Sequence, residues 1–577
     1  MSVTETQVDR RRESARWWVA AALILALALR IGAVFTSNIN WDEFALFHKV
    51  DITEVTGTLV TGGRPGLAVV MLLPFLAECD DETTVIRNAR LLWTFITVLW
   101  LVGLAVWIAA WVPESATRWR DAALGVCLLA LVPEFLDSSI EVRTDQLAVL
   151  GGTWGGALLL HSRRRPALAL LAGACLGAGL LGTQKLVYTA ALVGLVTVGQ
   201  LWMLREWRPL REGIRAAAVG LGFAAVLLAY RAFTAQAFEL PPASAAQAPI
   251  TTSTLNAGLS LFEFYRNTIG FSKYRELLPQ LIPHLALTVA LALATVRAWR
   301  EGLDDRVRLG LAWAALLLGV SVALFHAAAF SYFWMTLGLF PALAFAIAAE
   351  PLRRLVLPSA ERSRRVIVGG FWLVLVVPAV MQMGFLLSDT QSVQRDSLAF
   401  VHRNFERDVA GFHPESGLFC QAGIQPVRTY FSQHLYQDFA GTSREDHTKS
   451  LIGIFRRKPI AFMLQSFRLN QFPVEVRRFW ADNYQPYRGS VLVAGRRLEG
   501  RSGERTEIEL VVPGRYRWLP IGDPIPVVIG GRPIAAGEIV SLKSGILEIE
   551  FKVDVPAGLL VLALKDLPGP ASAAFYR

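Results

Sequence analysis

Cysteine is scarce in this chain. Four cysteines occur among 577 residues, Cys79, Cys127, Cys175 and Cys420. No two of them have the spacing of a CxxC pair or of metal ligands, and two lie inside apolar runs. The sequence therefore predicts neither a zinc site nor a disulfide framework.

Several motifs of common enzymes and pumps are also absent. The chain has no GxxxxGK[ST] loop, which argues against an ATP-driven pump. It has no HExxH and no GxSxG motif, so metalloprotease and serine-hydrolase chemistry have no support. Charge is low as well, because only 18% of residues are charged while 53% are hydrophobic. This balance is typical of a protein in lipid.

Long apolar runs occupy most of the chain from Trp17 to Leu387. Most are about 17–25 residues long, the length of a helix that crosses a hydrocarbon core of ~30 Å. These runs begin near Trp17, Leu91, Asp121, Gln146, Ala167, Leu186, Ile214, Leu281, Leu309, Phe330 and Val366. A shorter run at residues 65–77 is typical of a re-entrant or interfacial helix. We therefore expect a mostly α, polytopic membrane protein with about eleven transmembrane helices and one short helix.

Arginine indicates which connections face the cytoplasm. It gathers in alternate connections, at residues 118–120, 162–166, 205–215, 297–308 and 351–365. By the positive-inside rule these loops are cytoplasmic. Residues 1–16 then form a cytoplasmic tail, and residues 17–35, which lack a convincing cleavage site, form an uncleaved first helix. The net charge of +10 is explained without a nucleic-acid partner.

The loop after the first span carries two adjacent carboxylates, Asp42 and Glu43. A carboxylate at the membrane surface can be partly desolvated and still reachable from water, the setting of a tuned general base. The structural alternative is a helix N-terminus, since Asp and Glu are favoured in a first turn.

The second outer loop carries Glu141, Arg143 and Asp145 directly before a span. Charges at the edge of a membrane are costly, and they are functional by default. An ion pair between Arg143 and Asp145 is the structural alternative. Because two outer loops both offer acids, we expect one shared cavity.

Several outer groups could contact an anionic substrate. Lys185 lies at the outer end of a span, where a long cationic side chain could bind a phosphate or merely snorkel. Arg266 follows Tyr265 in the long outer loop, and His326 lies at an outer turn. Belt aromatics and a structural histidine are the alternative interpretations.

The hydropathy falls after Leu387, and two further regions are predicted. Residues 388–487 are expected to be mixed α and β, with a helix at 395–408 and buried strands at 416–421 and 460–464. Residues 488–577 are expected to form a small β-sandwich. Its predicted strands are residues 490–495, 506–512, 525–531, 538–542 and 546–555. We expect this domain to cap the outer face, with acceptor binding as the alternative.

The order of these features resembles the GT-C superfamily of integral-membrane glycosyltransferases. The resemblance lies in a first span, an outer Asp-Glu pair, a short Pro-led helix and then the segment "IRNARLLWTFITVLW". It is strongest to the branch with protein O-mannosyltransferases and lipid A aminoarabinose transferases, and it covers residues 17–387. Those enzymes take a sugar from a polyprenyl phosphate at the outer leaflet, which implies a bacterial inner-membrane protein with a periplasmic C-terminal region.

The resemblance implies a role for the acids. Asp42 matches the catalytic aspartate that activates the acceptor hydroxyl as general base, with Glu43 beside it. Arg143 and Asp145 match a second-loop motif, here spaced as Arg-Thr-Asp. Some members use a divalent metal ion, which Asp42, Glu43 and Asp145 could bind.

The resemblance also implies contacts with the donor. Arg64 and Pro65 match a basic-Pro-Pro motif in which Gly66 replaces the second proline. Arg90 matches the arginine that opens the next span, and Lys185 resembles a cation that contacts phosphate.

We therefore expect a hexosyl- or pentosyltransferase that moves a sugar from a polyprenyl-phosphate donor to a glycan, lipid or protein acceptor. Such transfer needs a base, a cationic clamp for the departing phosphate and a slot open to lipid. A transporter or flippase of lipid-linked glycans is the main alternative, although the internal repeats common in transporters are not evident. A non-catalytic envelope scaffold would leave the acids unexplained.

Overall fold

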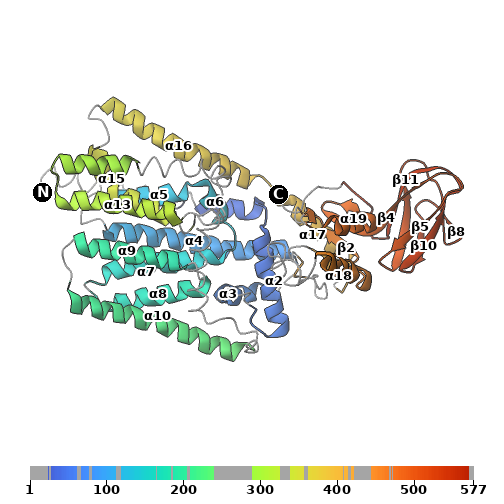
Figure 1. Ribbon diagram of the computed structural model, residues 1–577, viewed down its shortest axis with the longest axis horizontal. Helices are drawn as coiled ribbons and strands as arrows, with labels where there is room; N and C mark the ends of the chain where they lie inside the picture. The colour runs from blue at the N-terminus through green and yellow to red at the C-terminus, as the bar shows by residue number, and fades with distance from the viewer. Residues whose placement is uncertain are drawn as a thin grey trace. The chain divides into compact units, whose positions relative to one another are not determined.

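The structure is a computed structural model that is mostly helical, with strands only in its C-terminal region among the residues described (Figure 1). The described residues are 24, 27–60, 66–76, 81–111, 118–163, 165–183, 186–203, 208–239, 289–324, 335, 338–355, 361–406, 408–413, 418–420, 444–466, 469–470 and 472–570. The predicted class, helical with β structure at the C-terminal end, is confirmed at this level.

The chain divides into two compact units. A helical unit comprises Met1–Phe35, Ile52–Leu73 and Asn88–Ser388. A mixed unit comprises Thr36–Asp51, Pro74–Arg87 and Asp389–Arg577. Helices α2 (Trp41–Thr56), α3 (Leu67–Leu76) and α4 (Glu82–Trp111) each contribute residues to both units.

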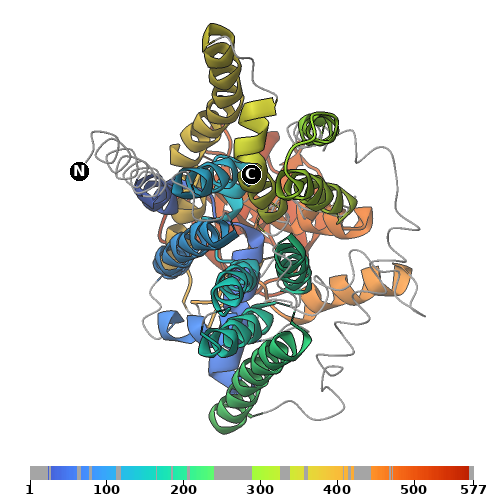
Figure 2. The same ribbon diagram turned by 90° about the vertical axis from the view of Figure 1, so that its left-hand side faces the viewer.

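The helices of the helical unit run roughly side by side (Figure 2). Besides α4 they are α5 (Arg118–Ala130), α6 (Pro133–Ser138), α7 (Thr144–His161), α8 (Ala167–Gly182), α9 (Leu186–Met203), α10 (Pro209–Ala237), α13 (Asp305–Leu324), α15 (Leu339–Leu355) and α16 (Glu361–Leu387). Two further helical stretches are Leu27–Thr36 and residues 289–300. The apolar run predicted to begin near Asp121 is divided between α5 and α6, because Pro133 cannot continue a helix and instead starts a new one.

Helix α4 supplies much of the core of the helical unit. Trp93, Trp100 and Trp107 recur every seven residues, which places them on one face of the helix, and all three are fully buried. Elsewhere in the helical unit, between α8 and α10, glycines let helices approach closely. A Cβ on Gly173 of α8 would lie 2.0 Å from the carbonyl oxygen of Val219 in α10, so only glycine fits there.

Two described helices are long and apolar enough to cross a membrane, judged by length and composition alone. They are α4 and α10. The other apolar helices of the described chain are shorter, and among them α3 has ten residues. The short helix predicted within residues 65–77 is therefore present, while its re-entrant path and the count of eleven spans stay predictions.

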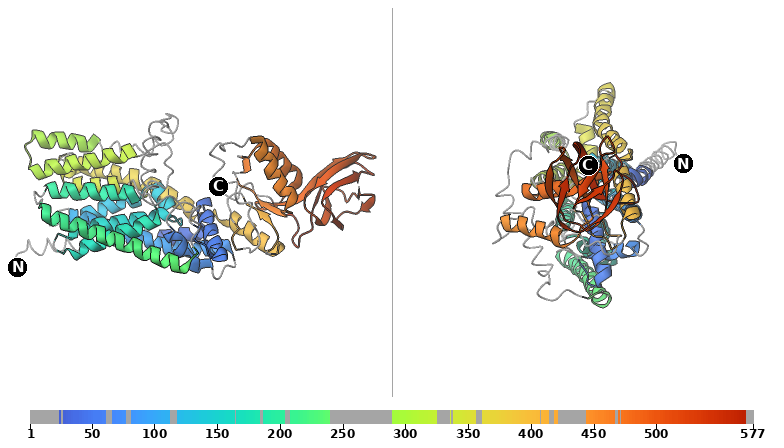
Figure 3. Two further views of the ribbon diagram at one scale, coloured as in Figure 1. Left: turned by 60° about the horizontal axis from the view of Figure 1, so that its bottom comes forward. Right: turned by 90° about the vertical axis from the view of Figure 1, so that its right-hand side faces the viewer.

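The described residues of the mixed unit form helices and two sheets (Figure 3). The helices that lie wholly within it are α17 (Ser392–Asn404), α18 (Arg444–Arg457) and α19 (Val474–Asn483). The strands are β1 (Gly411–Phe412), β2 (Phe462–Leu464), β3 (Tyr484–Arg488), β4 (Val491–Gly500), β5 (Arg505–Leu510), β6 (Gly514–Pro520), β7 (Val527–Ile529), β8 (Arg532–Ile534), β9 (Ile539–Leu542), β10 (Gly545–Glu550) and β11 (Val555–Leu562). Seven strands form one sheet, in the order β1-β2-β4-β11-β6-β9 with β3 also on β4, and β5-β10-β7-β8 form the other.

The sequence analysis did not predict four strands of the larger sheet, β1, β3, β6 and β11. In β6, Tyr516 and Trp518 are buried, and arginines occupy the alternate positions. The two-residue period of a strand is therefore present, but the alternate side chains carry charge. In β11, a Cβ on Gly558 would lie 2.0 Å from the ring of Trp518. Glycine is required there because the indole packs directly on the strand backbone.

Two predictions about the region near Cys420 are wrong. Residues 418–420 are buried but do not form a strand. Their burial comes from aromatic packing, since the rings of Phe419 and Phe47 stack with centroids 5.2 Å apart. Cys420 is also disulfide-bonded, whereas Cys127 and Cys175 are free. Tertiary folding brings disulfide partners together, and spacing in one sequence does not reveal them.

Candidate functional site

Half of the predicted site residues can be placed. Asp42 and Glu43 lie in the mixed unit, and Arg90, Arg143 and Asp145 lie in the helical unit. The others lie outside the described residues: Arg64, Lys185, Tyr265, Arg266 and His326.

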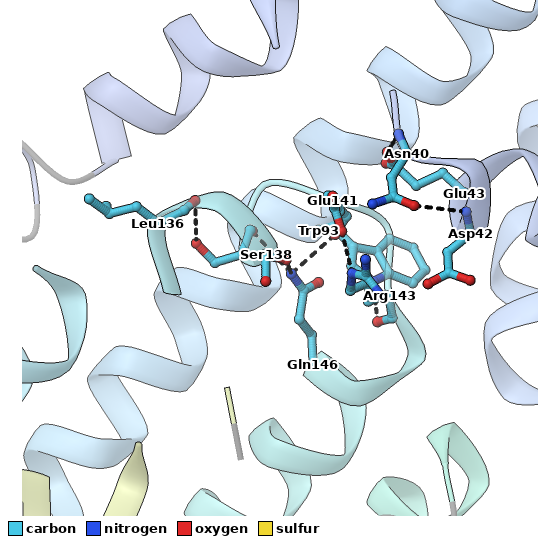
Figure 4. A network of polar contacts seen from close by, with 10 residues as sticks. Asn40, Asp42, Glu43, Trp93, Leu136, Ser138, Glu141, Arg143 and Gln146 are labelled. Atoms are coloured by element: carbon cyan, nitrogen blue, oxygen red, sulfur yellow. Dashed lines mark hydrogen bonds and ion pairs between the residues drawn. The ribbon is translucent and has the colours of Figure 1, made fainter. Parts of the chain in front are cut away.

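Asp42 and Glu43 occupy the first turn of α2 and have different environments (Figure 4). The Oδ1 of Asn40 accepts a hydrogen bond from the backbone N–H of Asp42 at 3.0 Å. In return, Oε2 of Glu43 accepts one from the backbone N–H of Asn40 at 3.0 Å. This reciprocal pair is a capping box, and it uses the carboxylate of Glu43 but only the backbone of Asp42. Glu43 is fully buried, whereas Asp42 is half-buried.

The segment before α2 is held by α17 and by the residues just before that helix. The hydroxyl of Thr390 accepts the N–H of Asn38 at 2.9 Å. The amide of Gln394 accepts the N–H of Ile39 at 2.7 Å and donates to its carbonyl at 2.8 Å. These contacts are buried or partly buried, so the start of α2 has a fixed position within the mixed unit.

The buried face of α2 packs on aromatic side chains of the same unit. The ring of Phe44 lies against His413, with centroids 6.2 Å apart, and against Phe419 at 6.3 Å. Burial lowers the pKa of His413 to about 3, so its imidazole is neutral near neutral pH. The packing places the acidic first turn of α2 beside a neutral, aromatic core.

The second predicted loop forms a buried ion pair in the helical unit (Figure 4). The guanidinium of Arg143 donates to the carboxylate of Glu141, and both side chains are almost completely buried. The indole N–H of Trp93 donates to the carbonyl of Arg143 at 2.8 Å. Glu141 is therefore a partner of Arg143, a pairing that the sequence analysis did not single out.

Backbone groups of this loop are satisfied by polar side chains around it. The side-chain amide of Gln146 donates to the carbonyls of Ser139 at 3.0 Å and Glu141 at 3.1 Å (Figure 4). The Nε of Arg30 donates to the hydroxyl of Ser139 at 3.1 Å. A loop with this many specific partners holds its charged side chains in place.

Asp145 follows this loop directly in the chain, whereas Arg90 lies on α4, the helix whose Trp93 contacts the loop. Asp145 is 4% exposed in the first turn of α7, where the helix dipole favours a carboxylate. Arg90 is fully buried on α4, one turn before Trp93, and so lies on the same side of that helix. The loop region of the helical unit thus contains buried groups of both signs.

A separate set of possible metal ligands was missed by the sequence analysis. Within the described part of the chain, Asp81, Glu82 and His402 form the group whose ligand atoms lie within 4.8 Å of one another. The histidine is 320 positions from Glu82, and no local spacing signals such a group. The adjacent Asp81 and Glu82 at the start of α4 were the only local sequence signal.

Comparisons with known proteins give distant structural similarities. No protein-family model and no curated protein matches the sequence. The apo oligosaccharyltransferase of Archaeoglobus fulgidus is 9% identical, with a TM-score of 0.49 over 97% of this chain and 98% of that one. AglB from that organism, an oligosaccharyltransferase in complex with an inhibitory peptide and a dolichol-phosphate, is 10% identical, with a TM-score of 0.44 over 96% and 99%. ArnT from Cupriavidus metallidurans, bound to undecaprenyl phosphate, is 13% identical, with a TM-score of 0.43 over 78% and 93%.

Proposed function

We propose that this chain is a membrane glycosyltransferase that moves a sugar from a polyprenyl-phosphate donor to a glycan, lipid or protein acceptor. Residues 17–387 form its transmembrane catalytic domain, and residues 388–487 and 488–577 form two extracytoplasmic domains. It acts at the outer face of a bacterial inner membrane, with a cytoplasmic N-terminus. The sugar is a hexose or a pentose.

One observation carries this proposal: the adjacent carboxylates of Asp42 and Glu43, in the first turn of α2, have different environments. Glu43 is buried and closes the capping box, so its carboxylate has a structural task. Asp42 stands in the same turn but is only half-buried, so its carboxylate lies nearer the protein surface than that of Glu43. A general base must be positioned yet accessible, and Asp42 satisfies both requirements.

In the proposed reaction, the acceptor hydroxyl oxygen attacks the anomeric carbon of the donor sugar. The bond from that carbon to the phosphate oxygen breaks, and polyprenyl phosphate leaves with the bonding electrons. Asp42 takes the proton of the hydroxyl as the new glycosidic bond forms. The proton and the leaving group are thus both accounted for.

Cationic groups would stabilise the negative charge of the departing phosphate. We assign this task to Arg90 and Arg143, which are buried and therefore act in a low dielectric. Glu141 orients the guanidinium of Arg143 through their ion pair. Asp145, which is buried in the first turn of α7, is proposed as a further acidic group for the reaction.

Further donor contacts follow from the resemblance to GT-C enzymes. Arg64 and Lys185 are assigned to the phosphate, and Tyr265, Arg266 and His326 to the sugar or its phosphate. These assignments rest on chain order and residue type.

The test compares envelope glycolipids and glycoproteins by mass spectrometry in cells with wild-type protein, Asp42→Asn or a deletion. We expect one sugar residue to disappear equally in the deletion and in a normally expressed Asp42→Asn protein. Asp51→Asn, on the same helix α2, is the matched control and should keep the sugar. If the deletion alters glycans while Asp42→Asn does not, the catalytic proposal fails, and transport or a scaffold explains the deletion.

A further inference from the structure

A histidine and two carboxylates of the mixed unit come together at the start of α4. Asp81 directly precedes the helix, Glu82 is its first residue, and His402 lies on α17. The Nε2 of His402 is 2.6 Å from Oε2 of Glu82. One possible ligand atom from each of the three residues lies within 4.8 Å of the other two.

The second oxygen of each carboxylate is held by protein donors. The Oε1 of Glu82 accepts the backbone N–H of Cys420 at 3.1 Å. The Oδ2 of Asp81 accepts both the backbone N–H of Thr84, at 3.0 Å, and its hydroxyl, at 2.8 Å. The hydroxyl of Thr83 donates to the same Oδ2. Metal-binding carboxylates are oriented by such outer hydrogen bonds, which leave the other oxygen for the ion.

The charge balance favours a cation at this point. Glu82 is fully buried, and Asp81 beside it adds a second carboxylate. His402, which is 21% exposed, is the neighbour of Glu82 on the opposite helix. Two adjacent carboxylates with one imidazole carry a negative charge when the imidazole is neutral, and a bound divalent ion would offset it.

We propose that Asp81, Glu82 and His402 form a binding site for one zinc ion. The predicted ligands are a carboxylate oxygen of Asp81, Oε2 of Glu82 and Nε2 of His402. The mixture of one imidazole and two carboxylates suits zinc, whereas magnesium and calcium prefer oxygen ligands alone. Three protein ligands leave a fourth position of the tetrahedron for water or another ligand.

The site goes beyond the proposed transfer reaction and does not use its residues. It joins the first turn of α4 to α17 across 320 positions of sequence, next to the disulfide-bonded Cys420. Zinc bound there would stabilise the mixed unit, because the ion binds a geometry that exists only in the folded chain.

The test measures zinc binding to the full-length protein purified in detergent and stripped with a chelator. Isothermal titration with Zn²⁺ should show one equivalent bound, and the unfolding temperature should rise with Zn²⁺ concentration. Co²⁺ should give visible absorption bands of a tetrahedral site, and Mg²⁺ should compete poorly. None of these measurements depends on transferase activity, so their outcome is separate from that of the Asp42 experiment.

Two variants identify the ligands. Asp81→Asn keeps an oxygen that can cap α4 but loses the charge, and His402→Gln loses the imidazole. Each should weaken Zn²⁺ binding by about tenfold or more. Asp396→Asn on α17 and His161→Gln on α7 are the matched controls, and they should bind as wild type does. If His402→Gln does not fold, Asp81→Asn decides the result alone.

The proposal is overturned if the wild-type protein binds less than one equivalent of Zn²⁺. It is also overturned if Asp81→Asn binds Zn²⁺ as tightly as wild type does while keeping the same unfolding temperature in chelator. The bound zinc would then be an adventitious ion only.

Discussion

The side-chain amide of Gln394 makes two hydrogen bonds to one backbone residue, Ile39. It accepts from the N–H at 2.7 Å and donates to the carbonyl at 2.8 Å. Both residues are fully buried, and 355 positions separate them. The contact satisfies both polar groups of a buried backbone residue and so fixes the approach to the first turn of α2.

Gln394→Glu should weaken this connection. A carboxylate can still accept the N–H of Ile39, but it places an acceptor against the carbonyl and buries a charge. We expect a loss of about 1–3 kcal/mol in the free energy of unfolding of the mixed unit, with reduced sugar transfer. Thermal unfolding in detergent measures the loss. Asp396→Asn, a 76% exposed neighbour on α17, is the control, and equal stability of the two variants would contradict the anchoring role of Gln394.

Glu43 is predicted to be structural although it stands beside the proposed base. Glu43→Gln retains an oxygen that can accept the N–H of Asn40, so folding and transfer should stay close to wild type. Glu43→Ala removes the side-chain half of the capping box and should lower the free energy of unfolding by about 1 kcal/mol. Sugar transfer and unfolding temperature are measured together for both variants. Loss of transfer in a stable Glu43→Gln protein would make Glu43 a catalytic group instead.

The buried pair of Glu141 and Arg143 should be sensitive to removal of one partner. Glu141→Gln leaves a buried guanidinium without its paired charge, a change that typically costs about 3–5 kcal/mol. The double variant Glu141→Gln/Arg143→Met removes both charges and should recover part of that stability. Unfolding temperatures of the three proteins in detergent check this, and a fully stable Glu141→Gln protein would show that the pair does not hold the loop.

His413 should make the mixed unit sensitive to acid. Its pKa is lowered from 6.5 to about 3 by burial, so between these values the unfolded chain binds a proton that the folded chain does not. Stability should therefore fall as pH decreases below about 6.5, by at most about 1.4 kcal/mol per pH unit, and should be unaffected by this group above that pH. The slope follows from unfolding curves recorded between pH 7 and pH 4.5.

His413→Phe is the matched variant for the acid effect, because it keeps an aromatic ring against Phe44. The stability difference between this variant and wild type should shift in favour of the variant as the pH falls. A difference that stays constant over the whole range would rule out His413 as the group responsible.

Features that depend on neighbours along the chain could be predicted from the sequence alone. Apolar runs predicted most of the described helices of the helical unit and the short α3, but not α18 or α19. The alternation of short segments predicted several strands of the C-terminal region. The Asp-Glu pair after the first apolar run marked the first turn of α2, for which helix capping was the stated structural alternative.

Tertiary packing brings together side chains that are far apart in the sequence. It joined Gln394 to Ile39, grouped His402 with Glu82 and placed Cys420 in a disulfide bond. It also gave Glu43 and Asp42 different degrees of burial, although the two are adjacent and similar in chemistry. Sequence periodicity predicts which face of a helix or strand is apolar, but it does not predict which distant element covers that face. The burial of a side chain and its hydrogen-bond partners depend on that covering element.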